Sequence, residues 1–326
     1  MYDAVPSLVE STVRVAAFPD GSVDTFQRVR AKDGQWLSKA AFREAIVAGR
    51  PQGFHIDTHA IEAGGQAVNA AQQANALGDD VRLDGCLDDD RFAFPFETHS
   101  FGDPSTVSIH EFSDGDLTYA EVSDDVADWS HEDFETVPDA DAYVCGNWAS
   151  VDGMTDSLTA LADRLEGGVF VFDPGDLTTA PAAEIRDCFA ALGTLDDAVD
   201  VAVSVNGREL TAIADALAVA DDVRAVRDET GAFAVVRHEA DAAAAATRTD
   251  DAVVENFDPN GPVRRTGGGD RFSAGLAHGL AAGGDIGPAM ALGNCCASYY
   301  VATGTTATAD DIASLATEQP EQWLAA

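Results

Sequence analysis

Three consecutive glycines and a carboxylate stand together in one short segment, Gly267-Gly268-Gly269-Asp270. Glycines have no side chain to pack, so a run of them lets another molecule approach the main chain closely. Residues 271–282 are rich in Ala and Leu and predict a helix, so the glycines precede a helix N-terminus with free N–H groups and a positive dipole end. This arrangement binds anions, and phosphate is the usual one.

Asp270 lies in the first turn of this predicted helix, beside the expected phosphate site. A carboxylate there complements the helix dipole, and it can also accept a proton from a hydroxyl that attacks phosphorus. The segment is not a P-loop, because no Gly-Lys-Ser/Thr follows, and it lacks the G-x-G-x-x-G spacing of a dinucleotide fingerprint. Taken alone, it leaves a phosphate site and a plain turn before a helix equally open.

A second glycine pair, Gly64-Gly65, precedes another predicted helix, 66–77, which stops at Gly78. Asn69 lies in the first turns of this helix, where its amide can reach a ligand that approaches the glycines. Helix N-termini of a doubly wound sheet gather at the carboxyl edge of the strands. The two glycine segments are therefore expected to border one cleft.

Other polar residues follow predicted strands and belong to the same edge. Asp24 comes after strand 13–18 and its turn, and Asn206 and Glu209 follow strand 199–205. A plain turn aspartate is the alternative interpretation of Asp24, because aspartate is common in turns.

Strand and helix patterns alternate through most of the chain. The predicted strands are residues 13–18, 81–87, 143–148, 169–172, 199–205, 232–237 and 252–257, and the predicted helices between them are 153–165, 181–192 and 210–220. Gly193 is expected to close helix 181–192, and the alanine run 240–246 predicts a short helix because alanine is the best helix former. Residues 106–112 and 117–122 predict a hairpin. Near-continuous apolar strands separated by helices indicate an α/β fold with a mostly parallel sheet covered on both faces.

The composition is strongly acidic. The 326 residues carry a net charge of −38, and 46% of them are apolar, enough for a sizeable core. We interpret the charge as a salt-adapted surface in which carboxylates hold water and cations. Nucleic acid is disfavoured as a partner, because the field repels phosphate backbones.

The cysteines and the hydropathy pattern indicate a cytoplasmic protein. The five cysteines form no C-x-x-C pair, so buried free thiols in a reducing compartment are expected. Residues 1–11 are not the apolar run of a signal peptide, and no apolar run reaches the length of a membrane span.

Taken together, the motifs resemble the ribokinase/PfkB family of carbohydrate kinases. The family signatures correspond to residues 64–78 and 266–275, and its Asn-x-x-Glu motif to 206–209. The resemblance covers nearly the whole chain and implies a ribokinase-like three-layer α/β/α sandwich with a small β lid over the acceptor site. The lid is expected from approximately residues 24–62 and 97–122, inserted in a single domain spanning 1–326.

The resemblance also implies a role for each motif residue. Asp270 corresponds to the general base, and the glycine amides correspond to an anion hole for the transferring phosphoryl group. Mg²⁺ would be held by Asn206 and Glu209, through water. The other positions implied are, for the anion hole, Gly267, Gly268 and Gly269; for the acceptor, Asp24, Gly64, Gly65 and Asn69; and for the nucleotide, Asn206, Thr266, Gly269 and Asn294.

Two features depart from the family pattern. Arg264-Arg265 stand where the family usually has Asp-Thr, and they either stabilise transferred charge or form salt bridges in an acidic surface. Residues 28–50 also form a basic segment, with Arg28, Arg30, Lys32, Lys39, Arg43 and Arg50 against Asp33 and Glu44. This segment recognises an anionic substrate, contacts a second subunit or, as we favour, is a solvated face paired with nearby carboxylates.

The sequence therefore predicts an ATP-dependent phosphotransferase that acts on a hydroxyl of a sugar or sugar-like acceptor. The basic segment mildly favours an anionic acceptor. ATP, Mg²⁺ and a monovalent cation such as K⁺ are the expected cofactors, and a homodimer through the lid is the expected assembly. A non-catalytic ribokinase-like protein that senses a sugar or nucleotide is the alternative.

Overall fold

The computed structural model describes residues 1–49, 53–134, 136–257 and 261–318. Its main sheet has nine strands in the order β13-β12-β11-β10-β9-β8-β1-β4-β5, and the pairs from β11 to β5 are all parallel. The strands are β1 Arg14–Phe18, β4 Asp80–Gly85, β5 Glu97–Ser100, β8 Ala142–Gly146, β9 Val169–Asp173, β10 Asp200–Val205, β11 Ala234–His238, β12 Ala242–Thr247 and β13 Asp251–Glu255. The predicted mostly parallel sheet is confirmed.

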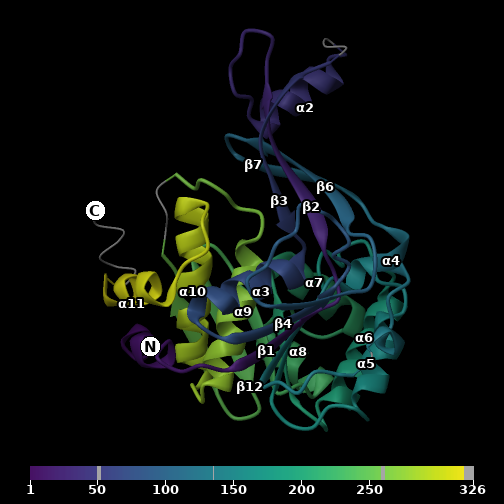
Figure 1. The fold of residues 1–326 in the computed structure, drawn as a ribbon, viewed down its shortest axis with the longest axis vertical. Coiled ribbons are helices and arrows are strands. Elements are labelled where there is room, and N and C mark those ends of the chain that lie inside the picture. The colour runs from purple at the N-terminus through teal and green to yellow at the C-terminus, as the bar shows by residue number, and fades with distance from the viewer. Residues whose placement is uncertain (50–52, 135, 258–260, 319–326) are drawn as a thin grey trace.

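Helices cover both faces of this sheet, as Figure 1 shows. In β9, Val169 and Val171 face one apolar cluster and Phe170 and Phe172 face the other, so the strand is buried on both sides. The first cluster contains α3 Gln66–Leu77, α9 Gly268–Ala281, α10 Ile286–Thr303 and the short terminal helices α1 Val5–Leu8 and α11 Ala309–Glu318. The second contains α5 Met154–Leu161, α6 Ala182–Leu195, α7 Gly207–Leu217 and α8 Val223–Thr230. The predicted three-layer α/β/α sandwich is confirmed.

A second sheet, called the small sheet below, projects from the sandwich at the top of Figure 1. Its order is β3-β2-β6-β7, and only the central pair, β2 with β6, is parallel. The strands are β2 Ser22–Arg30, β3 His55–Gly64, β6 Ser105–Phe112 and β7 Gly115–Glu121. The predicted hairpin is present as β6 and β7, and the helix α2 Lys39–Val47, with Ser38 as its N-cap, lies between β2 and β3. The short helix α4 Asp124–Ala127 follows β7.

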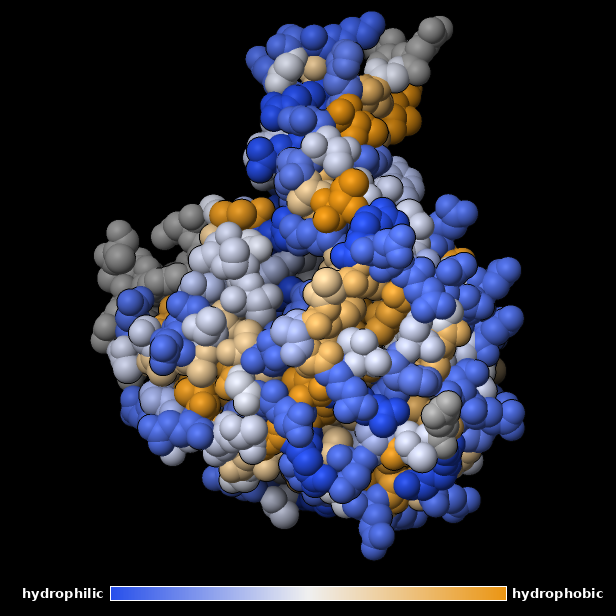
Figure 2. Space-filling view, in the orientation of Figure 1, coloured by the Kyte–Doolittle hydropathy of each residue, from blue (hydrophilic) through white to orange (hydrophobic). Residues whose placement is uncertain are grey.

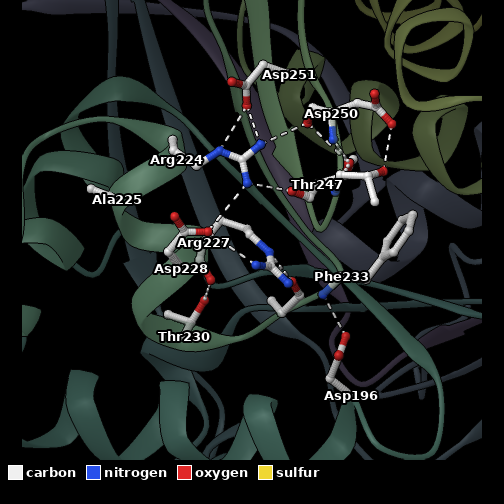
Figure 3. Close-up of polar contacts among 12 residues, drawn as sticks. Asp196, Arg224, Ala225, Arg227, Asp228, Thr230, Phe233, Thr247, Asp250 and Asp251 are labelled. Carbon is white, nitrogen blue, oxygen red and sulfur yellow. Dashed lines mark hydrogen bonds and ion pairs between the residues drawn. The ribbon is translucent and has the colours of Figure 1, made fainter.

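The alanine run 240–246 is not the helix that its propensity predicts. Residues 242–247 form β12, antiparallel to both β11 and β13. Helix α8 is hydrogen-bonded to β12 and β13 at this edge of the sheet. The Arg224 guanidinium donates to the Thr247 carbonyl oxygen at 2.6 Å and to the Asp251 carboxylate at 2.5 Å (Figure 3). Pairing on both sides and burial of the small side chains override a propensity that is only a weak preference.

Gly193 also does not close α6, which continues to Leu195. A Cβ at Gly193 would lie 3.0 Å from the carbonyl oxygen of Thr230, the last residue of α8. The glycine therefore allows two helices to approach each other rather than ending one of them.

The remaining expectations concern the thiols and the membrane. All five cysteines are free and buried, as predicted. Within the described ranges, no helix is both long and apolar enough to cross a membrane. The view in Figure 2 is dominated by hydrophilic residues, in keeping with the acidic composition.

Candidate active site

The glycine turn has the geometry that its composition predicts. Gly267 is the N-cap of α9, with a left-handed φ of +91°, and Asp270 lies in the first turn of the helix. A Cβ at Gly267 would lie 3.1 Å from Arg271 Nη1 and 3.4 Å from Asn69 Nδ2. Both the backbone conformation and the lack of space therefore require glycine at this position.

The two predicted motifs meet at this turn. The Asn69 side chain, on the first turns of α3, donates a hydrogen bond of 2.7 Å from Nδ2 to Asp270 Oδ2. Burial raises the pKa of Asp270, and the hydrogen bond from Asn69 and the charge of Arg271 partly oppose this shift. Asp270 is thus a fixed carboxylate with a greater affinity for a proton than an exposed aspartate.

A cavity of about 350 Å³ opens in front of Asp270, between the sandwich and the small sheet. Four carboxylates line it, and the residues described along its wall include no Lys or Arg. The lining residues are Asp20, Gly21, Ser22, Asp24, Gly65, Gln66, Asn69, Ser105, Val107, Thr118, Ala120, Val122, Asn147, Ser150, Asp176, Thr266, Gly267 and Asp270. The predicted residues Asp24, Gly65 and Asn69 therefore lie together, and we call this space the acceptor cavity.

Asp24 reaches the acceptor cavity from an unexpected place. It does not follow a strand of the main sheet but lies within β2 of the small sheet, beside Gly64 at the end of β3. Its Oδ1 accepts a 2.5 Å hydrogen bond from Ser22, and burial raises its pKa to about 6. A side chain at Gly64 would collide with the Asp24 carboxylate, so Gly64 serves the site by leaving room for Asp24.

Sequence reasoning missed Asp20. Its carboxylate accepts hydrogen bonds from the amides of Gln66 at 3.0 Å and Ala67 at 2.7 Å, and from the Asn147 side chain at 3.1 Å. Asp20 therefore supplies the cap that Gly65, the N-cap of α3, lacks. The available signal was an aspartate two residues after a buried strand, at the edge where ligands bind.

A second cavity of about 350 Å³ adjoins the other side of the glycine turn. Gly268 and Gly269 line this second cavity, whereas Gly267 and Asp270 line the acceptor cavity. The other lining residues, many of them apolar, are His238, Glu239, Ala240, Asn256, Phe257, Pro262, Arg265, Phe272, Ala297, Ser298 and Val301. We call this space the second cavity; the glycine turn is the boundary between the two.

Asn206 and Glu209 hold each other in a capping box at the start of α7. Glu209 accepts hydrogen bonds from the Asn206 amide at 2.8 Å and from its side chain at 2.6 Å, and burial raises the pKa of Glu209 to about 7. Neither residue lines either cavity, and the described residues contain no group of three or more His, Cys, Asp and Glu suited to a metal. Their predicted metal role stays a prediction.

Asp173, at the end of β9, is a second residue that sequence reasoning missed. It lies close enough to Asp270 and Glu209 for their charges to act on it, and it was visible in the sequence only as an aspartate that ends an apolar strand. Burial and these charges raise the pKa of Asp173 to about 8. Asp173, Asp270 and Glu209 therefore form an acidic group behind the glycine turn.

The structure places Asn294 away from both cavities, and its predicted contact with the nucleotide stays a prediction. Asn294 is fully buried and lines neither cavity; its amide donates to the Tyr2 hydroxyl at 3.1 Å and to the Val254 carbonyl oxygen at 3.3 Å. It joins α10 to β13 and to the N-terminal segment. The same helix does reach the second cavity, through Ala297, Ser298 and Val301, about one turn further along.

The three residues before the glycine turn, 264–266, have different surroundings. Arg264 forms an ion pair with Glu62 of the small sheet, with Nη1 2.6 Å from Oε2, whereas Arg265 lines the second cavity. Thr266 lines the acceptor cavity instead, and its hydroxyl donates to Asp116. The Gly268 amide is already engaged, donating to the Arg265 carbonyl oxygen at 3.2 Å.

The basic segment does not contribute to either cavity through its described residues. Arg28 lies over the Trp36 ring at 5.2 Å, Arg30 pairs with Asp57 at 3.3 Å, and Lys39 donates to the Asp116 carbonyl oxygen at 2.6 Å. These partners fit a face paired locally more than a site for an anionic substrate. Arg50 lies outside the described residues.

Comparisons with known proteins place the chain in a family. The family described as prokaryotic ketohexokinase matches residues 53–319. A ketohexokinase from Haloferax volcanii is 27% identical over 325 residues, covering 90% of this chain and 85% of the relative.

Solved structures share the fold. A Methanocaldococcus jannaschii nucleoside kinase, an archaeal member of the ribokinase family, superposes with a TM-score of 0.67 at 14% identity, covering 94% of this chain and 98% of that chain. A fructokinase with bound ATP from Xylella fastidiosa gives a TM-score of 0.65 at 17% identity, with the same coverage. At these identities the likeness shows the fold alone.

The raised carboxylate pKa values predict an unusual dependence of stability on pH. A carboxyl whose pKa is raised by folding contributes stability at low pH and loses it as the pH rises through the folded-state value. For Asp173 this window ends at about pH 8. The ligand-free protein should therefore lose stability as the pH rises from about 4 to about 8, and Asp173→Asn should flatten this slope in thermal unfolding measured in molar KCl.

Asp163→Asn, at an exposed residue after α5, is the control for the general effect of removing one negative charge. A slope equally steep in wild type and Asp173→Asn would contradict the interpretation.

Proposed function

Since the chain belongs to the prokaryotic ketohexokinase family and is a PfkB-type, ribokinase-like carbohydrate kinase, we propose that it transfers the γ-phosphoryl group of ATP to a sugar hydroxyl. We propose Asp270 as the general base of this reaction. The observation that carries the proposal is the glycine turn shared by two cavities. Phosphoryl transfer needs an acceptor and a nucleotide whose reacting ends meet at one point, held by groups that stabilise the charge between them. Family membership and the position of Asp270 favour catalysis over a non-catalytic sensor.

Asp270 has the properties of a base for this reaction. Its carboxylate faces the acceptor cavity, the Asn69 hydrogen bond fixes its orientation, and its raised pKa increases its affinity for the hydroxyl proton. The amides of Gly267 and Gly269, with the positive end of α9, would stabilise the transferring group, because Gly268 already donates to Arg265.

A neutral polyhydroxy acceptor suits the acceptor cavity better than the anionic acceptor favoured by the basic segment. Asp20, Asp24, Asp176 and Asp270 would repel a phosphate or carboxylate group, whereas they can accept hydrogen bonds from hydroxyls. The relative from Haloferax volcanii is a ketohexokinase, so we propose a neutral ketohexose. A nucleoside is the second candidate, because a neighbour with the same fold is a nucleoside kinase.

The surroundings of Asp173 and Glu209, behind the glycine turn, are where we propose a divalent cation. Asp173 and Glu209 are buried carboxylates with raised pKa values, which is the behaviour of groups that lack a compensating positive charge. We propose that they hold Mg²⁺ through water, with Asn206 orienting Glu209. Bound Mg²⁺ would neutralise phosphate charge during transfer. A monovalent cation such as K⁺ is proposed with it, and its test is activity in KCl against equimolar choline chloride.

Asp270→Asn tests the assignment of the base. The amide keeps the size of the carboxylate but cannot take the proton, so kcat should fall by about 10²–10⁴-fold while both KM values change little. The measurement is release of ADP and of sugar phosphate in molar KCl, against a panel of neutral ketohexoses, aldoses, sugar acids and nucleosides. Turnover undiminished in Asp270→Asn would eliminate Asp270 as the base, and phosphorylation of only the nucleosides would replace the sugar.

Arg265 is proposed to bind the nucleotide phosphates. It is the one Lys or Arg among the described residues that line the second cavity, in a protein whose overall charge repels a triphosphate. Arg265→Ala should therefore raise the KM for ATP by about tenfold and leave the KM for the sugar unchanged, whereas Arg265→Lys should retain most of the affinity. Steady-state kinetics at fixed salt give both constants. An unchanged KM for ATP in Arg265→Ala would refute the role.

The small sheet is proposed to act both as the lid over the acceptor and as a dimer interface. No residue of α2 is buried, and its exposed apolar side chains include Ile46 and Val47; Figure 1 shows α2 on the part that projects from the sandwich. Ile46→Asp should lower the dimer fraction in sedimentation measurements in molar KCl, because a charge in an apolar contact is costly. Val253→Asp, at an exposed apolar residue of β13, is the control. A monomeric wild type would disprove the dimer.

A further inference from the structure

The segment that leads into the glycine turn is held by the small sheet at one strongly buried side chain. Arg264, three residues before Gly267, pairs with Glu62 of β3, and its guanidinium carbon lies 3.9 Å above the centre of the Phe26 ring of β2. The Arg264 side chain is only 11% exposed, whereas the Glu62 side chain is 47% exposed. Salt therefore screens the ion pair in part, while the packing of Arg264 on Phe26 adds a contact on the buried side.

The same strand segments touch the acceptor cavity. Residues two apart in a strand lie on the same face, so Phe26 shares a face of β2 with Asp24, and Glu62 shares a face of β3 with Gly64. Asp24 lines the acceptor cavity and Gly64 makes room for its carboxylate. A shift of Asp24 and Gly64 toward a bound acceptor therefore also moves Phe26 and Glu62, which contact Arg264.

Arg264 is anchored on its other side by α10. The amides of Val263 and Arg264 both donate to the Val301 carbonyl oxygen, at 2.8 Å and 3.2 Å. Thr266 adds a second link to the small sheet, because its hydroxyl donates to Asp116 Oδ2 of β7 at 3.1 Å. The short connection to Gly267 is thus fixed between α10 and three strands of the small sheet. Because it is fixed at both sides, a movement of the small sheet is expected to move the glycine turn as well.

We propose that Arg264 and Glu62 are positioning residues that couple seating of the acceptor under the small sheet to the geometry of the glycine turn. The inference rests on the kinase function proposed above. Its consequence is selectivity for transfer over hydrolysis. With the ion pair intact, binding of an acceptor brings the glycine amides to the positions where they stabilise the transferring phosphoryl group. Without the ion pair, the glycine turn is misplaced, and water attacks the phosphoryl group in place of the sugar more often.

Glu62→Gln tests the coupling. It removes the ion pair but keeps the size of the side chain. Glu62 lines neither the acceptor cavity nor the second cavity, but it borders a smaller cavity of about 260 Å³ with Asp24 and Asn69, so the KM for the sugar is measured as well; a raised KM with an unchanged ratio of hydrolysis to transfer would mark a lost acceptor contact and contradict the coupling. We expect kcat for sugar phosphorylation to fall by about tenfold, and the ratio of ATP hydrolysis without acceptor to sugar phosphorylation to rise by a similar factor. A role in folding alone would lower the amount of active protein and leave this ratio unchanged.

Matched variants separate coupling from general damage. Asp57→Asn removes the Arg30–Asp57 ion pair, which also involves β3 but does not touch Arg264, and should keep the wild-type ratio. The exchange Arg264→Glu with Glu62→Arg restores opposite charges and should return the ratio toward wild type. If Glu62→Gln does not fold, Glu62→Asp, which keeps the charge on a shorter side chain, should still raise the ratio.

The outcomes separate this inference from the proposed function. A wild-type protein that phosphorylates no acceptor overturns both. The coupling alone is overturned if the wild type is a kinase and Glu62→Gln has the same ratio of ATP hydrolysis to sugar phosphorylation as Asp57→Asn. Where Glu62→Asp replaces Glu62→Gln, the same comparison applies to it. A raised ratio that the exchanged pair restores supports the coupling.

Discussion

The hydrogen bond between Asn69 and Asp270 joins the N-terminal turns of two helices. Asn69 belongs to α3 and Asp270 to α9, and the helices start at Gly65 and Gly267 with no side chain at either cap. Any other residue at Gly267 would need a left-handed backbone, and its Cβ would lie 3.1 Å from Arg271 Nη1. Two positive dipole ends therefore lie near one place, where a carboxylate and a phosphoryl group can both be held.

The concentration of buried carboxylates is the second defining property of the site. Asp20, Asp24, Asp173 and Glu209 all have pKa values raised first by burial. Burying an acid is unfavourable unless it is hydrogen-bonded or compensated. Asp20 is hydrogen-bonded by the amides of α3, Glu209 by the amide and side chain of Asn206, and Asp173 by the Gly175 amide, so hydrogen bonds offset part of the cost of each. The arrangement is consistent with a neutral acceptor on one side and a metal-bound nucleotide on the other.

The small sheet gives the acceptor cavity its second wall. Asp24 and Ser22 come from β2, and Ser105 and Val107 from β6, whereas Asp20 and Asp270 come from the sandwich. The cavity is therefore bounded by two bodies with separate sheets. Contacts such as Arg264–Glu62 then matter for chemistry, because they relate the position of one body to the glycine turn of the other.

Local patterns in the sequence were enough for the fold class, the strand–helix alternation and the two motifs that meet at Asp270. These features follow from strand hydropathy, helix caps and glycine, which act over a few neighbouring residues. Alanine propensity failed for residues 242–247, because pairing with β11 and β13 and the Arg224 contacts override a weak local preference. Gly193 was misjudged because its neighbour Thr230 is remote in sequence, and the burial of Asn294 beside Tyr2 depends on an equally remote contact. Asp20, Asp173 and the partner of Arg264 likewise emerged only in three dimensions, where burial and distance across the chain set which polar groups meet.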